Sequence, residues 1–139
     1  MNFTIYLVFD KNCREAFELY RTVFGGEFTE FLTYGEGPPE MNVLEGDRDL
    51  VMHMSLPIGS NVLMGCDIDS QTPPLIPGNN FAVSVSPDSR EEADRLFSEL
   101  SEGGAAVMPM ADMFWGGYFG MCVDKFGISW QINFGPPAD

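Results

Sequence analysis

The chain is poor in positive charge. Its 139 residues include 7 Lys and Arg against 21 Asp and Glu, which gives a formal charge of −14 with the single histidine neutral. Proteins that bind nucleic acids or anionic membranes gain affinity from Lys and Arg side chains that contact phosphate groups. The charge balance therefore excludes a nucleic acid bound through its phosphates and a membrane surface bound by electrostatics.

Cysteines and long apolar runs are also scarce. Cys13, Cys66 and Cys122 are odd in number and widely spaced, which favours three free thiols over a disulfide framework or a zinc knuckle. No apolar run approaches the roughly 18 residues of a membrane span, and residues 1–6 lack the basic start of a secretory signal. We therefore expect a cytoplasmic protein.

Hydrophobic residues are plentiful by contrast, at 45% of the chain, and they include 12 Phe, 4 Tyr and 2 Trp. Disordered acidic chains lack such residues, so this chain is expected to fold. Its length suits one domain that buries about two thirds of the surface of the unfolded chain.

Two segments predict amphipathic helices that lie 77 residues apart. One begins at Asn12 with Glu15 three residues later, and the other begins at Ser89 with Glu92 three residues later. Each pair predicts a capping box, and each helix is followed by a glycine pair. Apolar residues at helical spacing then share one face of each helix. These residues are Ala16, Leu19, Tyr20 and Val23 in the first helix, and Ala93, Leu96, Phe97 and Leu100 in the second.

Each predicted helix is preceded by one strand-like segment and followed by three. The segments are 3–9, 28–34, 50–56 and 61–67 in the first half, and 81–86, 105–110, 118–124 and 128–134 in the second. Three prolines in residues 70–78 predict a linker between module one, 1–69, and module two, 79–135. We predict an α+β fold of two tandem βαβββ modules, whose curved mixed sheets surround a cleft with the helices outside.

Several motifs occur in a recognisable order: 9–17 with Tyr20, 24–27, 52–56, 88–93, and the aromatic block 114–121 running into 124–127. Together they resemble the vicinal oxygen chelate (glyoxalase, bleomycin resistance, extradiol dioxygenase) superfamily, and its PhnB-like branch in particular. The resemblance covers nearly the whole chain. It implies one glyoxalase-like domain over 1–139, a pocket inside each curved sheet, and a homodimer.

The resemblance also implies a divalent metal held by His or carboxylate ligands from the first and last strands of each module. Module two follows module one by 77 residues at the helices, and by 68 when Gly59 is aligned with Gly127. These offsets place the four ligand positions near Thr4, Leu63, Phe81 and Gln131, and none of these is His, Asp or Glu. We therefore expect no intact metal site and no cofactor, and a divalent metal stays the alternative.

Alternation along 50–56 and 128–134 puts His53 and Gln131 on the less apolar face of each strand, which we expect to point into the cleft. His53 is the only imidazole, and it is the candidate catalytic residue. It can be a general base, a lone metal ligand, a hydrogen-bond donor that orients a substrate, or a strand histidine with no such role. Asp67 and Asp69 are either its carboxylate partners or solvated loop residues.

The block 114–121 combines four aromatic residues with three glycines, which suits a loop over a flat ligand and equally suits a core or dimer contact. The acidic run 36–49 predicts a solvated loop, since it lacks the ligand spacing of a calcium loop. The predicted ligand pocket consists of Thr4, Tyr6, His53, Leu63, Phe81, Trp115, Tyr118 and Gln131.

Two functions remain open from the sequence. The favoured one is a metal-free protein that binds a small apolar or aromatic molecule in the cleft. The alternative is a metal-dependent lyase or dioxygenase with a rearranged site that includes His53. A third interpretation, the 3-demethylubiquinone methyltransferase name attached to this branch, finds no support because no glycine-rich turn joins a strand to a helix.

Overall fold

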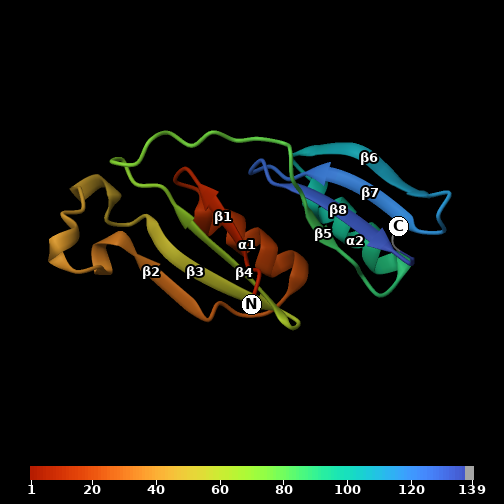
Figure 1. The fold of residues 1–139 in the computed structure, drawn as a ribbon, viewed down its shortest axis with the longest axis horizontal. Coiled ribbons are helices and arrows are strands. Elements are labelled where there is room, and N and C mark those ends of the chain that lie inside the picture. The colour runs from red at the N-terminus through yellow and green to blue at the C-terminus, as the bar shows by residue number, and fades with distance from the viewer. Residues whose placement is uncertain (137–139) are drawn as a thin grey trace. The chain divides into compact units, whose positions relative to one another are not determined.

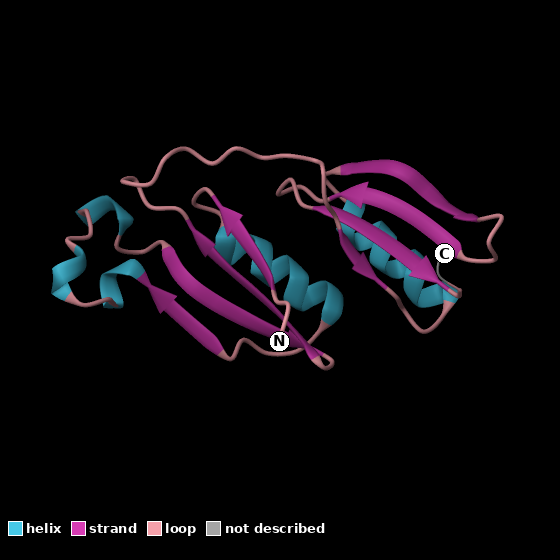
Figure 2. Cartoon of the chain, in the orientation of Figure 1, coloured by secondary structure: helices cyan, strands magenta, loops and turns pink. Residues whose placement is uncertain are grey.

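The chain forms two compact units, Met1–Ile76 and a second that begins at Pro77, in a computed structural model that describes residues 1–136. Each unit holds one α-helix and one four-stranded mixed sheet, as Figures 1 and 2 show. The α+β class and the repeated βαβββ order are confirmed. Neither α-helix within residues 1–136 is long and apolar enough to cross a membrane.

The first unit contains β1 (Ile5–Phe9), α1 (Cys13–Phe24), β2 (Glu30–Thr33), β3 (Val51–Ile58) and β4 (Asn61–Asp67). The strands are ordered β1-β4-β3-β2, with β1 parallel to β4 and the other pairs antiparallel. The second unit contains β5 (Val83–Val85), α2 (Arg90–Ser101), β6 (Ala105–Asp112), β7 (Tyr118–Val123) and β8 (Ser129–Phe134). Its order, β5-β8-β7-β6, repeats the same topology.

Each helix packs on one face of its own sheet, as Figure 1 shows. The side chains that α1 buries are Cys13, Ala16, Phe17, Tyr20 and Val23, and those that α2 buries are Ala93, Leu96 and Leu100. One helix covers only one side of a sheet, so each sheet has a helix-covered face and an open face. Both ends of α2 lie 77 residues after those of α1, as the sequence predicts.

The two helices begin differently, and the predicted capping box at Asn12 is wrong. Asn12 makes no side-chain cap bond. The Asp67 carboxylate, at the end of β4, accepts instead from the backbone N–H of Cys13 and from that of Val51, both at 2.9 Å. Asp67 is 2% exposed, so the expectation of a solvated loop carboxylate is also wrong. At α2 the predicted cap is present, because Ser89 Oγ accepts from the N–H of Glu92 at 3.1 Å.

The acidic run 36–49 is largely exposed, and it contains ordered turns. Three one-turn 3-10 helices, Tyr34–Glu36, Pro39–Met41 and Glu45–Asp47, join β2 to β3. Asp47 is buried and accepts from the N–H and the hydroxyl of Ser70, at 2.9 and 2.6 Å. These hydrogen bonds lower the pKa of Asp47. The stretch is therefore anchored at one carboxylate while the rest of it meets solvent.

Candidate functional site

Strand register decides which side chains of the first unit share the open face. Tyr6 on β1 lies opposite Met64 on β4, Met64 lies opposite Ser55 on β3, and Ser55 lies opposite Glu30 on β2. Opposed residues project to the same side of a sheet, so these four form one row across it. His53 projects to the same side because it lies two residues from Ser55.

His53 contacts three side chains of this face. Its Nδ1 lies 3.0 Å from the Tyr6 hydroxyl, and the two rings are stacked with centroids 5.7 Å apart. Its Nε2 lies 3.2 Å from Ser55 Oγ and 3.5 Å from Glu30 Oε1. Ser55 Oγ in turn donates to Glu30 Oε1 at 3.0 Å. A neutral imidazole with its proton on Nε2 satisfies every one of these contacts.

Cys66 completes the cluster through a hydrogen bond with the Tyr6 hydroxyl. Burial, and then the neighbouring Cys66, raise the pKa of Tyr6 to about 12. Burial also raises the pKa of the Cys66 thiol. Tyr6 is therefore a neutral hydroxyl at physiological pH. We call Tyr6, His53, Ser55, Glu30 and Cys66 the His53 network.

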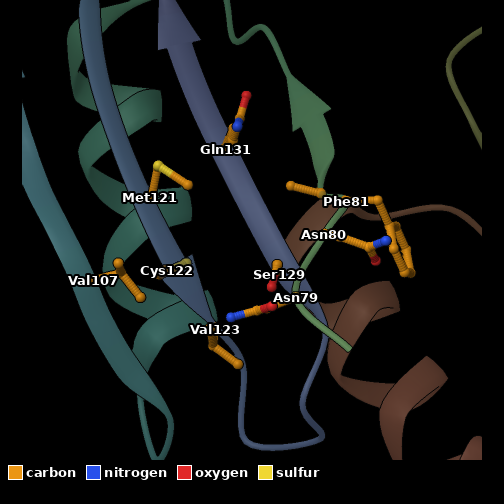
Figure 3. Close-up of a pocket in the computed structure, with 10 residues that line it drawn as sticks. Asn79, Asn80, Phe81, Val107, Met121, Cys122, Val123, Ser129 and Gln131 are labelled. Atoms are coloured by element: carbon orange, nitrogen blue, oxygen red, sulfur yellow. The ribbon is translucent and has the colours of Figure 1, made fainter. Parts of the chain in front are cut away.

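The open face of the second unit contains a hollow of about 410 Å³. Figure 3 shows its lining, which comes from β6, β7, β8 and the segment that leads into β5. Met121 on β7 and Gln131 on β8 lie opposite each other in its lining, and Gln131 also lies opposite Ser84 on β5. The full lining is Asn79, Asn80, Phe81, Ala82, Val107, Met121, Cys122, Val123, Ser129 and Gln131.

The aromatic block divides between the two faces of the second sheet. Trp115 packs edge-on against Phe119, with centroids 5.7 Å apart, and Phe119 lies opposite Asn133 on the open face. Tyr118 turns the other way: its hydroxyl donates to Asp94 of α2 at 2.5 Å, and the Arg90 guanidinium lies 3.8 Å from its ring centre. Tyr118 therefore ties the helix to the sheet.

Among residues 1–136, two buried polar atoms have no hydrogen-bond partner, Trp115 Nε1 and Asn133 Oδ1. Both lie beside Gly117, where an added Cβ would stand 2.4 Å from the indole nitrogen and 2.6 Å from the amide oxygen. A side chain at this position would collide with both atoms. Gly117 is therefore required for the loop to pack as it does.

The structure brings some of the predicted pocket residues together and separates others. In the first unit Tyr6 and His53 are in contact, and Thr4 is an exposed residue just ahead of β1. In the second unit Phe81 and Gln131 line one hollow. Trp115 packs on the same face, whereas Tyr118 does not.

Leu63 is 4% exposed and lies opposite Leu56 on the helix-covered face, away from His53. The sequence offset of 68 pairs it with Gln131. Gln131 lies on the open face of its sheet, so this offset matches residues on opposite faces. A slip of one residue moves a strand side chain to the other face.

Sequence reasoning missed Glu30 and Cys66 as neighbours of His53. The carboxylate beside His53 is Glu30, on the edge strand β2, and neither of the two aspartates considered. Asp67 caps α1, and Asp69 accepts from Thr72 Oγ1 and from the N–H of Gln71 in a loop turn. No local pattern identifies Glu30, since its position depends on the pairing of β2 with β3.

The donor set does not fit the metal that the superfamily implies. Within residues 1–136, no three or more His, Cys, Asp and Glu side chains gather in a way that could hold a metal ion. Both ring nitrogens of His53 are engaged by protein groups. The open face of the second sheet offers Gln131, Ser84 and Ser129, which are neutral oxygen and amide donors that transition metals seldom use alone.

Comparison with known proteins places this geometry in context. A family model described as 3-demethylubiquinone-9 3-methyltransferase matches residues 1–133. Protein YjdN of Escherichia coli K12 is 27% identical over 137 residues, which cover 92% of this chain and 91% of YjdN.

Solved structures extend the comparison. Protein PA1353 of Pseudomonas aeruginosa is 36% identical, with a TM-score of 0.87 over 96% of this chain and 97% of that one. The putative 3-demethylubiquinone-9 3-methyltransferase, PhnB protein, of Bacillus cereus is 24% identical, with a TM-score of 0.79 over 97% of this chain and 100% of that one. A glyoxalase-related enzyme of Fulvimarina pelagi shares the fold at 15% identity, with a TM-score of 0.66 over 98% and 89% of the two chains.

Proposed function

Because the chain belongs to the 3-demethylubiquinone-9 3-methyltransferase family, the PhnB-like branch of the vicinal oxygen chelate superfamily, we propose that it binds a small apolar or aromatic molecule on the open face of its second unit without a metal ion. The hollow of about 410 Å³ carries this proposal. Its volume is within the range of roughly 300–1,000 Å³ typical of small-molecule sites.

The chemistry of the lining supports the choice of ligand. Phe81, Val107, Met121 and Val123 offer carbon and sulfur surface, and a methionine adapts its shape to different ligands. Gln131 lies among them and offers one amide, which suits a ligand with a single hydroxyl or carbonyl group. Apolar contact would then give affinity, and the amide would give orientation.

Methyl transfer is not included in the proposal, although the family description names it. The turns that enter the two helices, 10–12 and 87–89, contain no glycine. Sites that bind a nucleotide-like cofactor at a helix start use glycine-rich turns, because the backbone must approach the ligand closely.

The alternative function is a metal-dependent lyase or dioxygenase whose rearranged site includes His53. It needs at least three protein ligands for a catalytic metal, and the His53 network supplies no such set. Elemental analysis of protein purified without chelator, followed by thermal shift with zinc, nickel and manganese, tests it directly. A metal that co-purifies, or that raises the melting temperature at equimolar concentration, would favour this alternative.

A homodimer and a cytoplasmic location accompany the proposal. The homodimer follows from the family resemblance, and the location follows from the sequence pattern alone. Light scattering measures the first, and a strictly monomeric result contradicts it. Cell fractionation measures the second, and recovery of the protein outside the cytoplasmic fraction contradicts it.

Tryptophan fluorescence tests ligand binding in the second unit, since both tryptophans, Trp115 and Trp130, lie there. Naphthalene and quinoline should quench the emission in a saturable manner. Met121→Glu places a charge in the lining of the hollow, so it should weaken the binding of both compounds at least tenfold. The matched control is Met64→Glu on the open face of the first unit, which should leave the affinity within twofold. A flat response of the wild-type protein to both compounds rules out the proposed site.

A further inference from the structure

The His53 network forms a second cluster that the proposed function does not use. It lies on the open face of the first unit and is reachable from outside, since Tyr6 is 45% exposed and the side chain of His53 is 28% exposed. Its groups come from all four strands of that sheet: Tyr6 from β1, Glu30 from β2, His53 and Ser55 from β3, and Cys66 from β4. An inference about this cluster stands independently of the hollow.

With His53 neutral, the strongest hydrogen-bond donors of the network are all in use. The Tyr6 hydroxyl donates its one proton to Nδ1 at 3.0 Å. The Nε2 proton is directed at Ser55 Oγ, whose own proton goes to Glu30. Tyr6 then presents only oxygen lone pairs to anything that approaches from outside.

Protonation of His53 reverses the first of these bonds. An imidazolium carries a proton on both nitrogens, so Nδ1 becomes the donor and the Tyr6 oxygen becomes its acceptor. The Tyr6 proton is then released from His53. The Glu30 carboxylate lies 3.5 Å from Nε2, on the other side of the ring from Tyr6.

The acceptor that lies beside the Tyr6 hydroxyl, apart from His53, is the Cys66 sulfur. A thiol sulfur accepts hydrogen bonds weakly, whereas a carbonyl oxygen accepts them well. We propose that Tyr6 and His53 form a binding site for a small neutral carbonyl compound, held by the Tyr6 hydroxyl when His53 is protonated.

The surroundings select a neutral ligand over an anionic one. Glu30 is part of the network, and the chain carries a formal charge of −14, so a carboxylate would meet repulsion at this face. Apolar side chains flank the pair: Met64 lies opposite Tyr6, Leu32 lies opposite His53, and Val8 follows Tyr6 on the same face. A carbonyl group attached to a compact hydrocarbon body matches both features.

The other titratable groups near Tyr6 hold their protons more tightly than usual, so they stay neutral near pH 7. Burial, Cys66, Cys13 and Tyr34 together raise the pKa of Tyr6 to about 12. Burial raises the pKa of Cys66 and of Cys13 as well. Imidazole is the side chain type that titrates between pH 5 and 8. Because the proposed site needs a protonated imidazole, ligand affinity should fall as the pH rises.

The chain holds one histidine, so its NMR signal reports this site without overlap. We would label the full-length protein with 15N-histidine and titrate pH with acetophenone, a neutral aromatic ketone. Acetophenone that binds only the protonated form raises the pH midpoint of the histidine signal. At an acetophenone concentration of ten times its dissociation constant, the rise is about one pH unit. Ethylbenzene, which lacks the carbonyl, should leave the midpoint unchanged, and benzoate should shift it less than acetophenone does.

Two variants assign the effect to the Tyr6 hydroxyl. Tyr6→Phe keeps the ring stacked on His53 and removes only the oxygen, so acetophenone should no longer move the midpoint. The matched control is Tyr118→Phe, which removes the same atom in the second unit and should respond as wild type does. The proposal is overturned by an unchanged wild-type midpoint up to the solubility limit of acetophenone, by an equal shift in Tyr6→Phe, or by a larger shift with benzoate. Tryptophan fluorescence of the same samples reports the second unit separately, so failure of one site does not imply failure of the other.

Discussion

The open faces of the two sheets occupy the same places in one repeated topology and differ in chemistry. The row Tyr6, Met64, Ser55 and Glu30 crosses the first sheet, and the row Ser84, Gln131, Met121 and Met108 crosses the second. The first row carries a hydroxyl network with a carboxylate and an adjacent imidazole. The second carries thioethers around one amide.

This difference teaches that the open faces are not needed to specify the fold. Each sheet packs its covered face on one helix, and that packing uses Leu7, Met54 and Leu56 in the first unit and Val83, Trp130 and Ile132 in the second. Side chains on the other face contribute less to burial, so they are free to differ. Function is therefore best sought where the two repeats diverge.

The covered faces differ in residue size as well, and a substitution at Gly65 should have the largest effect. Phe17 of α1 packs where Gly65 leaves room, since an added Cβ at Gly65 would lie 2.6 Å from its ring. The helix residue 77 positions after Phe17 is Asp94, and the covered face of β8 carries Trp130 and Ile132, with no glycine among them. Gly65→Ile would make the first unit resemble the second and should cost about 3 kcal/mol, because it overpacks the core.

Urea denaturation measures this change. The double variant Phe17→Ala with Gly65→Ile should regain a substantial part of the unfolding free energy that Gly65→Ile loses. In this variant the strand supplies the bulky side chain in place of the helix. As a control, Ile132→Val should cost only about 1 kcal/mol. A Gly65→Ile protein as stable as wild type would show that the two covered faces are interchangeable.

Each unit also buries a carboxylate at the end of a strand that holds backbone donors, but at different strands. Asp124, after β7, accepts from the N–H groups of Phe126 and Ile128 and from Trp130 Nε1 at 2.8 to 3.1 Å. Asp67, the last residue of β4, caps α1. Asp124→Ala and Asp67→Ala should each cost about 2 kcal/mol, because buried donors lose their acceptor. Asp69→Ala, in an exposed turn, should change the denaturation midpoint little, and a cost equal to the other two would contradict this assignment.

Alkaline pH should reveal a smaller difference between the units. Burial and neighbouring cysteine and acidic groups raise the pKa of Tyr6 and of Tyr34, both in the first unit, to about 12. The folded state thus holds these protons more tightly than the unfolded chain, whose tyrosines titrate near 10. Their contribution to stability is present below about pH 10 and is lost as the pH rises to about 12.

Ultraviolet titration of phenolate formation measures this directly. Tyr6→Phe should remove absorbance change near pH 12, and its stability should decline less steeply between pH 10 and 12 than that of wild type. Tyr118→Phe, in the second unit, serves as the comparison. The pKa of Tyr118 is raised chiefly by its hydrogen bond to the exposed Asp94, whereas that of Tyr6 is raised chiefly by burial. Loss of signal near pH 10 in Tyr6→Phe would contradict the assignment.

Local sequence patterns determined the repeat, the two helices and the approximate strands. Helical spacing and alternation are short-range signals, so the offset of 77 residues and the covered faces could be read directly. Alternation also put His53 and Gln131 on the open faces. The first helix cap was misread because its acceptor, Asp67, lies 54 residues from Cys13 in sequence.

Tertiary structure alone decided which polar groups meet. Glu30 reaches His53 only because β2 pairs with β3 in one register, and Leu63 misses the open face because its strand register places it opposite Leu56 on the covered face. Tyr118 joins α2 because its register, opposite Phe134, places it on the helix-covered face. Strand register depends on side-chain packing between segments far apart in the chain, and no local pattern contains that information.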